Sequence, residues 1–216
     1  MSARENILAR LRGSLGRNSG NDASGRAMID EYLAARARGP QAKPGGDLLA
    51  RFCEESGKLS STVDEVAALG DVPRAIARYL TDRRLPGRAV CWPEFADLDW
   101  RAAQLDVAAR AANGDDPVGI TGCLCAIAET GTLMLCSGSA TPAATSLLPE
   151  THIVIVPARL VVAVMEDGWQ LVRAESGGWP RAINFISGPS RTGDIEQTIV
   201  LGAHGPYRVH IVIVRE

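Results

Sequence analysis

The feature that most constrains the fold of this chain is a series of short apolar segments between residues 118 and 165. The segments read VGITG, CAIAE, TLMLC, HIVIVP and LVVAV, and each has the length of a strand bounded by Gly, Thr or Pro. A turn at Gly131 predicts a hairpin between CAIAE and TLMLC. HIVIV is apolar on both faces, which is typical of a central strand covered on both sides. We therefore expect a buried sheet at the centre of the domain.

Helical patterns alternate with these and other strand-like segments. Residues 72–85 carry an early proline, apolar residues on one face and a glycine beyond the end, which predicts a helix. Short helices are also expected at residues 166–173 and at residues 193–200. TVDE at residues 62–65 has capping-box spacing, which predicts that Thr62 introduces a short helix ending near Gly70. Further strands are expected in RAVCW, AINFIS and YRVHIVIV. This alternation predicts an α/β fold in which an open mixed sheet is covered by helices.

The first 46 residues are expected to form a separate region, and residues 47–216 the compact domain. Isoleucine and leucine recur at helical spacing between positions 7 and 15, with arginines on the other face, which predicts an N-terminal helix. The rest of this region is rich in Gly, Ser, Asn, Arg and Pro. Such a composition is typical of an extended arm.

Charge and hydropathy exclude two classes of partner. The formal net charge of -2 argues against a general nucleic-acid binder, because such proteins need clustered positive charge. No window reaches the roughly eighteen apolar residues of a membrane span, and the best candidate, IVIVPARLVVAV, is interrupted by Pro157 and Arg159.

The cysteines do not form a recognisable framework. The chain has five of them, an odd number, and no secretory signal is apparent, so we expect reduced thiols rather than disulfides. Cys123, Cys125 and Cys136 lack the usual four-ligand spacings of a zinc or iron–sulfur site. No glycine fingerprint of a Rossmann dinucleotide site follows a strand either. We therefore expect no metal and no cofactor on this chain.

The polar turn in FISGPSRTGDIEQ is the first candidate for chemistry. Gly188 and Pro189 shape the turn, and Ser190 or Thr192 is placed to cap the helix expected at residues 193–200. Free amides of a helix N-terminus, two hydroxyl groups and the Arg191 guanidinium would then form an anion site. The alternative is that Thr192 only caps the helix and Arg191 pairs with a neighbouring acid.

Two further groups are candidates for proton transfer. Glu129 ends an apolar segment, where a partly desolvated carboxylate can act as a base or a nucleophile; its alternative role is to accept hydrogen bonds in a hairpin turn. His204 lies in GAHGP, a glycine-framed loop that exposes an imidazole. His152 and His210 lie in apolar strands and are expected to be structural.

Three blocks of the sequence together resemble the LUD (lactate utilisation) domain family. They are GITG followed by AIAETGTLML, then LLPETHIVIVP, and then SGPSRTGDIEQTIVLGAHGP. ETGT alone is a weak motif, but the order and spacing of the three blocks are specific, and the resemblance covers at least residues 117–214. It implies a fold similar to the isomerase and CoA-transferase superfamily.

The resemblance also implies a function. The chain would be a cytoplasmic subunit of a complex that oxidises L-lactate to pyruvate, with two companion proteins of which at least one carries iron–sulfur clusters. The chain would bind a small anion. It could also assemble with further copies of itself into a homo-oligomer. Two alternatives stay open: an acyl or CoA transferase that attacks with Glu129, in the Glu-x-Gly context of Thr130 and Gly131, and a non-catalytic scaffold subunit.

The residues expected to form the site fall into two groups. The catalytic candidates are Glu129 and His204. The candidates for binding the anion are Thr130, Gly131, Thr132, Ser187, Gly188, Ser190, Arg191, Thr192, Asp194 and Glu196.

The missing ligand spacing leads to a direct prediction. We expect the anaerobically purified chain to contain no stoichiometric iron or zinc and to show no visible absorption, because its cysteines are not spaced for a cluster. Elemental analysis and absorption spectroscopy measure this. One metal ion per chain would contradict it.

Overall fold

The computed structural model describes residues 2–16, 23–40, 45–174, 178–195 and 198–216. The chain divides into two compact units, Met1–Pro40 and Gln41–Glu216. The smaller unit contains α1 (Ala3–Ser14) and α2 (Ala23–Ala35), so the predicted N-terminal helix is confirmed. A capping box begins α1, because Ser2 and Glu5 each bond the other's backbone N–H through their side chains.

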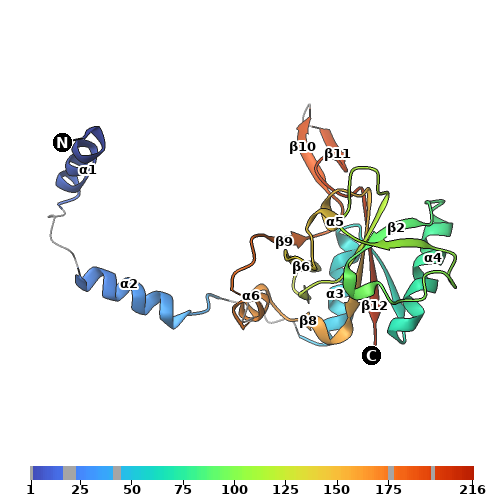
Figure 1. Ribbon diagram of the computed structural model, residues 1–216. Helices are drawn as coiled ribbons and strands as arrows, with labels where there is room; N and C mark the ends of the chain where they lie inside the picture. Colours follow the sequence, from blue (N-terminus) through green and yellow to red (C-terminus); the bar gives the residue numbers. More distant parts are fainter. Residues whose placement is uncertain (1, 17–22, 41–44, 175–177, 196–197) are drawn as a thin grey trace. The chain divides into compact units, whose positions relative to one another are not determined.

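A parallel sheet of six strands forms the centre of the larger unit (Figure 1). Its strand order is β1-β12-β7-β4-β2-β3, and every neighbouring pair is parallel. The strands are β1 (Thr62–Val66), β12 (Arg208–Val214), β7 (Thr151–Pro157), β4 (Val118–Thr121), β2 (Arg88–Cys91) and β3 (Asp106–Ala109). The middle strands are buried along almost their whole length, as the apolar pattern of HIVIV predicts.

A smaller mixed sheet packs beside the first, in the order β8-β5-β6-β9. Its strands are β8 (Val161–Val162), β5 (Cys125–Ile127), β6 (Thr132–Cys136) and β9 (Ile183–Ile186). Alternate residues of this sheet face two different cores. Ala126 and Leu133 join the core of the central sheet, whereas Cys125, Ile127 and Met134 pack against α6. The small sheet is therefore covered on both sides. Because successive side chains of a strand point to opposite faces and each face meets a core, both faces are apolar.

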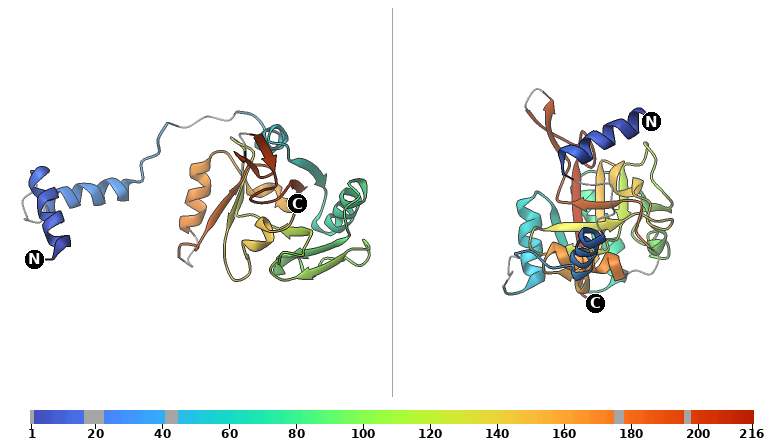
Figure 2. Two further views of the ribbon diagram at one scale, coloured as in Figure 1. Left: turned by 90° about the horizontal axis from the view of Figure 1, so that it is seen from above. Right: turned by 90° about the vertical axis from the view of Figure 1, so that its left-hand side faces the viewer.

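Helices cover the sheets from outside. The helices of this unit are α3 (Leu48–Lys58), α4 (Val72–Asp82), α5 (Ala144–Leu147) and α6 (Met165–Ala174). Figures 1 and 2 show α4 and α6 on opposite outer sides, with both sheets between them. The predicted α/β fold is thus confirmed, with the refinement that its strands divide between a parallel sheet and a mixed one. No helix in the described ranges has the length and apolar character that a membrane span requires.

Two expected helices are strands instead. Thr62 to Glu65 belong to β1, because the Thr62 hydroxyl bonds Nδ1 of His210 across the sheet (2.8 Å) rather than capping a helix. Residues 193–195 and 198–200 belong to two antiparallel strands, β10 (Arg191–Ile195) and β11 (Thr198–Leu201). Thr, Ile and Val are abundant in this segment, and their preference for strands outweighs the capping pattern.

Two histidines are enclosed by the central sheet and held neutral. His210 stacks on Tyr79 with ring centroids 3.8 Å apart, and Nε2 of His152 bonds the Thr121 hydroxyl at 2.8 Å. Burial lowers the pKa of His152 to about 3 and that of His210 to about 4. Both imidazoles are therefore structural, as expected from their positions in apolar strands.

These depressed pKa values predict a loss of stability in mild acid. Below the ordinary histidine pKa of 6.5 the unfolded chain binds protons that the folded chain rejects, so the stability present above that pH falls as the pH decreases toward 4. Between pH 7.5 and 5.0, His210 alone should lower the free energy of unfolding by about 2 kcal/mol. Urea unfolding of the wild type and of His210→Asn measures the difference in pH dependence.

The exposed His204 provides the matched control. His204→Asn should keep the pH dependence of the wild type, whereas His210→Asn should show a shallower one. Equal slopes in all three proteins would show that the buried imidazole does not govern acid stability.

Candidate functional site

The order of strands in the central sheet creates a natural place for a ligand. From β2 the chain moves outward to β3, and from the neighbouring β4 it moves the other way, to β7 and then β12. Ligands of open parallel sheets bind outside the carboxyl ends of the strands where the winding direction reverses. Between β2 and β4 that position lies beside the residues that follow Cys91 and Thr121.

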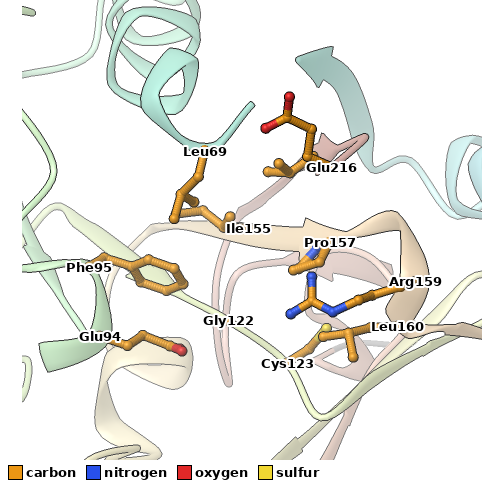
Figure 3. A pocket seen from close by; sticks show the side chains of 11 residues that line it. Leu69, Glu94, Phe95, Gly122, Cys123, Ile155, Pro157, Arg159, Leu160 and Glu216 are labelled. Carbon is orange, nitrogen blue, oxygen red and sulfur yellow. The ribbon is translucent and has the colours of Figure 1, made fainter. Parts of the chain in front are cut away.

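A cavity of about 310 Å³ lies at this edge, and we call it the inner cavity (Figure 3). Its lining comes from the segments that follow β2, β4, β7 and β12, together with the loop before α4. The lining residues are Leu69, Glu94, Phe95, Gly122, Cys123, Ile155, Pro157, Arg159, Leu160, Val214 and Glu216. The cavity is thus mostly apolar, with a few charged groups that come from different strand ends.

Glu94 and Arg159 supply the opposed charges nearest its middle. Glu94 belongs to the short helix Pro93–Phe95 directly after β2, and Arg159 to the short helix Ala158–Leu160 directly after β7. Figure 3 shows the Glu94 carboxylate and the Arg159 guanidinium pointing into the cavity from different sides. Neither group has a hydrogen bond or an ion pair with another residue in the described part of the chain. Both are therefore available to a ligand.

The cavity walls change the acidity of the groups beside them. Partial burial raises the pKa of the Glu94 carboxyl above its ordinary value. The carboxylate lies against Gly122, where a Cβ atom would be 2.6 Å from Oε1 of Glu94. Burial, and then the neighbouring Cys125 and Glu94, raise the pKa of the Cys123 thiol. Glu94 therefore keeps its proton to a higher pH than an ordinary glutamate, whereas Cys123 stays a neutral thiol and a poor nucleophile.

A second cavity of about 620 Å³, the outer cavity, meets the first at Glu94, Cys123 and Leu160. Its other walls come from the loop after β6 and from residues 178–181. Because these three residues line both cavities, the two adjoin, and we refer to them together as the groove.

The residues predicted from ETGT and SGPSR form a different cluster. The hydroxyl groups of Thr130, Thr132 and Ser187 are linked by two hydrogen bonds of 2.8 Å each. The pairing of β6 with β9 explains this contact, because it continues from Leu133 and Ile186 to Thr132 and Ser187. Sequence reasoning thus brought together residues that do meet in space.

Two glycines of this cluster lie against α3 and the turn that follows it. Gly131 has a φ of +65°, and a Cβ atom there would be 2.3 Å from the backbone N of Ser56. Gly188 has a φ of +83°, and its Cβ would be 2.2 Å from the carbonyl oxygen of Leu59. Both positions exclude a side chain, so these glycines fix the packing of the hairpin turn on α3.

Arg191 binds the end of the same helix rather than an open anion site. Its guanidinium donates to the Ser60 hydroxyl at 2.6 Å and to the Leu59 carbonyl at 3.4 Å. A cation at the C-terminal carbonyl groups of a helix is stabilising. The helix on which the predicted anion cradle depends is not formed, because Arg191 and Thr192 begin strand β10.

The remaining predicted residues lie around this cluster. Glu129 is half-buried at the end of β5, and its backbone N–H donates to Ala163; His204 is exposed in the loop before β12. Ser190 donates through its backbone to Pro206. Asp194 lies on β10, and Glu196 lies outside the described residues.

The predicted cluster and the cavities lie at opposite edges of the central sheet. Leu59 leads into β1 and Pro206 into β12, so the cluster adjoins the amino edge. Neither of the two connected cavities has a predicted site residue in its lining. Sequence reasoning missed Glu94 and Arg159, although both follow apolar strands that end in a proline, in CWPEF and VIVPAR. That position after a parallel strand was the available signal.

These observations define the class of protein: an α/β protein with a groove at the carboxyl edge of a parallel sheet. A family model described as the LUD domain matches residues 59–214. The chain is 34% identical to Lactate utilization protein C of Shouchella clausii over 166 residues, 74% of this chain and 70% of that protein. It is 33% identical to Lactate utilization protein C of an Exiguobacterium species over 165 residues, 75% of this chain and 70% of that one. The chain belongs to the LUD domain family.

A solved structure supports the fold. A DUF162 family protein from Deinococcus radiodurans is similar with a TM-score of 0.60 and 23% identity, over 80% of this chain and 100% of that one. The resemblance that the three sequence blocks indicated is therefore confirmed at the level of the family.

The contacts of Arg191 predict a structural effect of its removal. Arg191→Ala should lower the free energy of unfolding by about 1 kcal/mol, because two exposed hydrogen bonds to the end of α3 are lost. Its effect on the affinity for lactate should be small. Urea unfolding and calorimetric titration measure the two quantities, with Arg101→Ala, at an exposed arginine elsewhere, as the control. A selective loss of lactate binding with unchanged stability would instead restore the anion cradle at this turn.

Proposed function

We propose that this protein is a component of a cytoplasmic L-lactate utilisation system and binds a small hydroxy or keto acid in the inner cavity. In this proposal, L-lactate is oxidised to pyruvate together with iron–sulfur partner proteins. The relatives named Lactate utilization protein C support the process. The unpartnered Arg159 over an apolar cavity is the single observation that supports binding on this chain.

The chemistry of lactate suits this cavity. A guanidinium binds a carboxylate at two points, and Arg159 presents one without competition from a described neighbour. Phe95, Ile155 and Leu160 offer apolar surface to a methyl group. The cavity is at the lower end of the volumes usual for ligand sites, as a substrate with few atoms requires.

Glu94 has the role of a proton acceptor in this proposal. Its raised pKa brings a carboxylate closer to neutral pH, where it can take the hydroxyl proton of lactate or return one to the keto oxygen of pyruvate. Oxidation also removes a proton and two electrons from the carbon that bears this hydroxyl group, and the proton passes to solvent. The sequence offers no carrier for the electrons, so the iron–sulfur partner is their proposed acceptor.

Acyl or CoA transfer remains the second hypothesis from the sequence. It requires Glu129 to attack a thioester. Glu129 lies near the amino edge and lines neither of the two cavities. The geometry therefore favours binding of a small acid beside Glu94 and Arg159 over acyl transfer by Glu129. A scaffold subunit without a ligand is the third hypothesis, and binding measurements separate it from the first.

Removal of Arg159 tests the proposal. Arg159→Ala should weaken the binding of lactate and pyruvate about ten- to a hundredfold, because one charged hydrogen-bonding clamp is lost. Calorimetric titration of the full chain measures the affinity. Arg101→Ala is the matched control and should bind like the wild type, and thermal melts check that each variant is folded.

The pH dependence of the affinity for lactate and pyruvate is a second test of the same site. Protonation of Glu94 removes a negative charge that repels the ligand's carboxylate, so wild-type affinity should increase as the pH falls through the raised pKa of Glu94. Glu94→Gln should bind with little dependence on pH. If neither lactate nor pyruvate binds the folded wild type at millimolar concentration, the small-acid site on this chain is wrong and the scaffold hypothesis takes its place.

A further inference from the structure

The outer cavity has features that a small hydroxy acid does not use. Its volume of about 620 Å³ is twice that of the inner cavity. Trp92 contributes a buried aromatic wall, Trp179 and Arg181 lie on the segment between α6 and β9, and Ser137 and Thr141 add hydroxyl groups. This combination of aromatic rings, a cation and hydroxyl groups is chemically suited to a larger ligand with a ring and an anionic group.

Trp179 is held in place but leaves much of its ring uncovered. Its indole packs at a tilt on Trp169 of α6, with ring centroids 6.3 Å apart, and the Arg173 guanidinium lies 6.0 Å from the ring centre. Trp169 is in turn supported by Phe185 of β9, at 5.6 Å. Yet 65% of Trp179 is exposed, beside a cavity. A supported and exposed indole offers a stacking surface to a planar ring.

Arg181 places a positive charge on the same wall. It is two residues from Trp179, with Pro180 between them, and all three line the outer cavity. The exposed Arg181 guanidinium has no hydrogen bond or ion pair with any residue that the structure describes. Glu94 lies at the opposite, inner end, where its negative charge would repel a phosphate. Within the outer cavity the charges are therefore separated, with the cationic Arg181 beside the exposed ring and the anionic Glu94 where this cavity meets the inner one.

We propose that the outer cavity binds a nucleotide, with its heteroaromatic ring on Trp179 and its phosphate on Arg181. Arginine binds phosphate at two points, and stacking on an aromatic side chain holds the ring. The site does not use a Rossmann glycine turn, which agrees with the absence of that fingerprint in the sequence. The bound nucleotide would adjoin the inner cavity at Glu94, Cys123 and Leu160.

Calorimetric titration of the full chain with ADP and with FMN tests the site. Each carries a heteroaromatic ring and a phosphate group, and ribose 5-phosphate serves as the probe that lacks the heteroaromatic ring. We expect ADP or FMN to bind and ribose 5-phosphate to bind at least tenfold more weakly, because stacking contributes much of the affinity. Equal binding of ribose 5-phosphate would reduce the site to a phosphate site and overturn the proposal.

Matched variants locate the binding. Trp179→Ala should weaken the better probe about five- to a hundredfold, and Trp179→Phe should retain most of the affinity, because it keeps an aromatic face. Arg181→Ala should weaken it about tenfold, and the control Arg101→Ala should not. Arg159→Ala should leave nucleotide binding unchanged, so failure of the inner site and failure of the outer site can be told apart. Binding of neither ADP nor FMN at 1 mM, or unchanged binding by both Trp179→Ala and Arg181→Ala, would refute the nucleotide site.

Discussion

The parallel pairing of β12 with β7 is the constraint on which the rest of the larger unit depends. Seven residue pairs join the two strands, from Arg208 and Thr151 to Val214 and Pro157. The same strand β12 also pairs with β1, so the last strand of the chain closes the sheet between the first strand and the middle ones. Because both faces are buried, a shift of one residue would exchange side chains between the two faces, so the fit of the individual side chains, rather than the apolar pattern, fixes the register.

This pairing also places the groove. Pro157 and Val214 are opposite each other at the carboxyl ends of β7 and β12, and both line the inner cavity. The segments that leave these ends and those of β2 and β4 carry the charged groups. The packing of these strands thus positions Glu94 and Arg159. Because no bond joins the two side chains, their charges can interact with a ligand.

The two edges of the sheet have different uses. At the amino edge, glycines, hydroxyl groups and Arg191 are engaged with α3 and with one another, so the ETGT and SGPSR parts of the LUD blocks contribute to packing there. At the carboxyl edge, charged and aromatic groups face open volume. A polar motif in a sequence can therefore mark either a ligand site or a tightly packed turn, and contacts decide between them.

The sequence by itself determined the class of fold, the covered central strands, the helix at residues 72–82, the hairpin at Gly131 and the family. These follow from apolar period, turn residues and motif order, which are local properties of the chain. Only the tertiary structure decided that residues 62–66, 191–195 and 198–201 are strands, since cross-strand partners outweigh a local capping pattern. It also decided the candidate site, because Glu94 and Arg159 are 65 positions apart and meet only when β2 and β7 take their places on either side of β4.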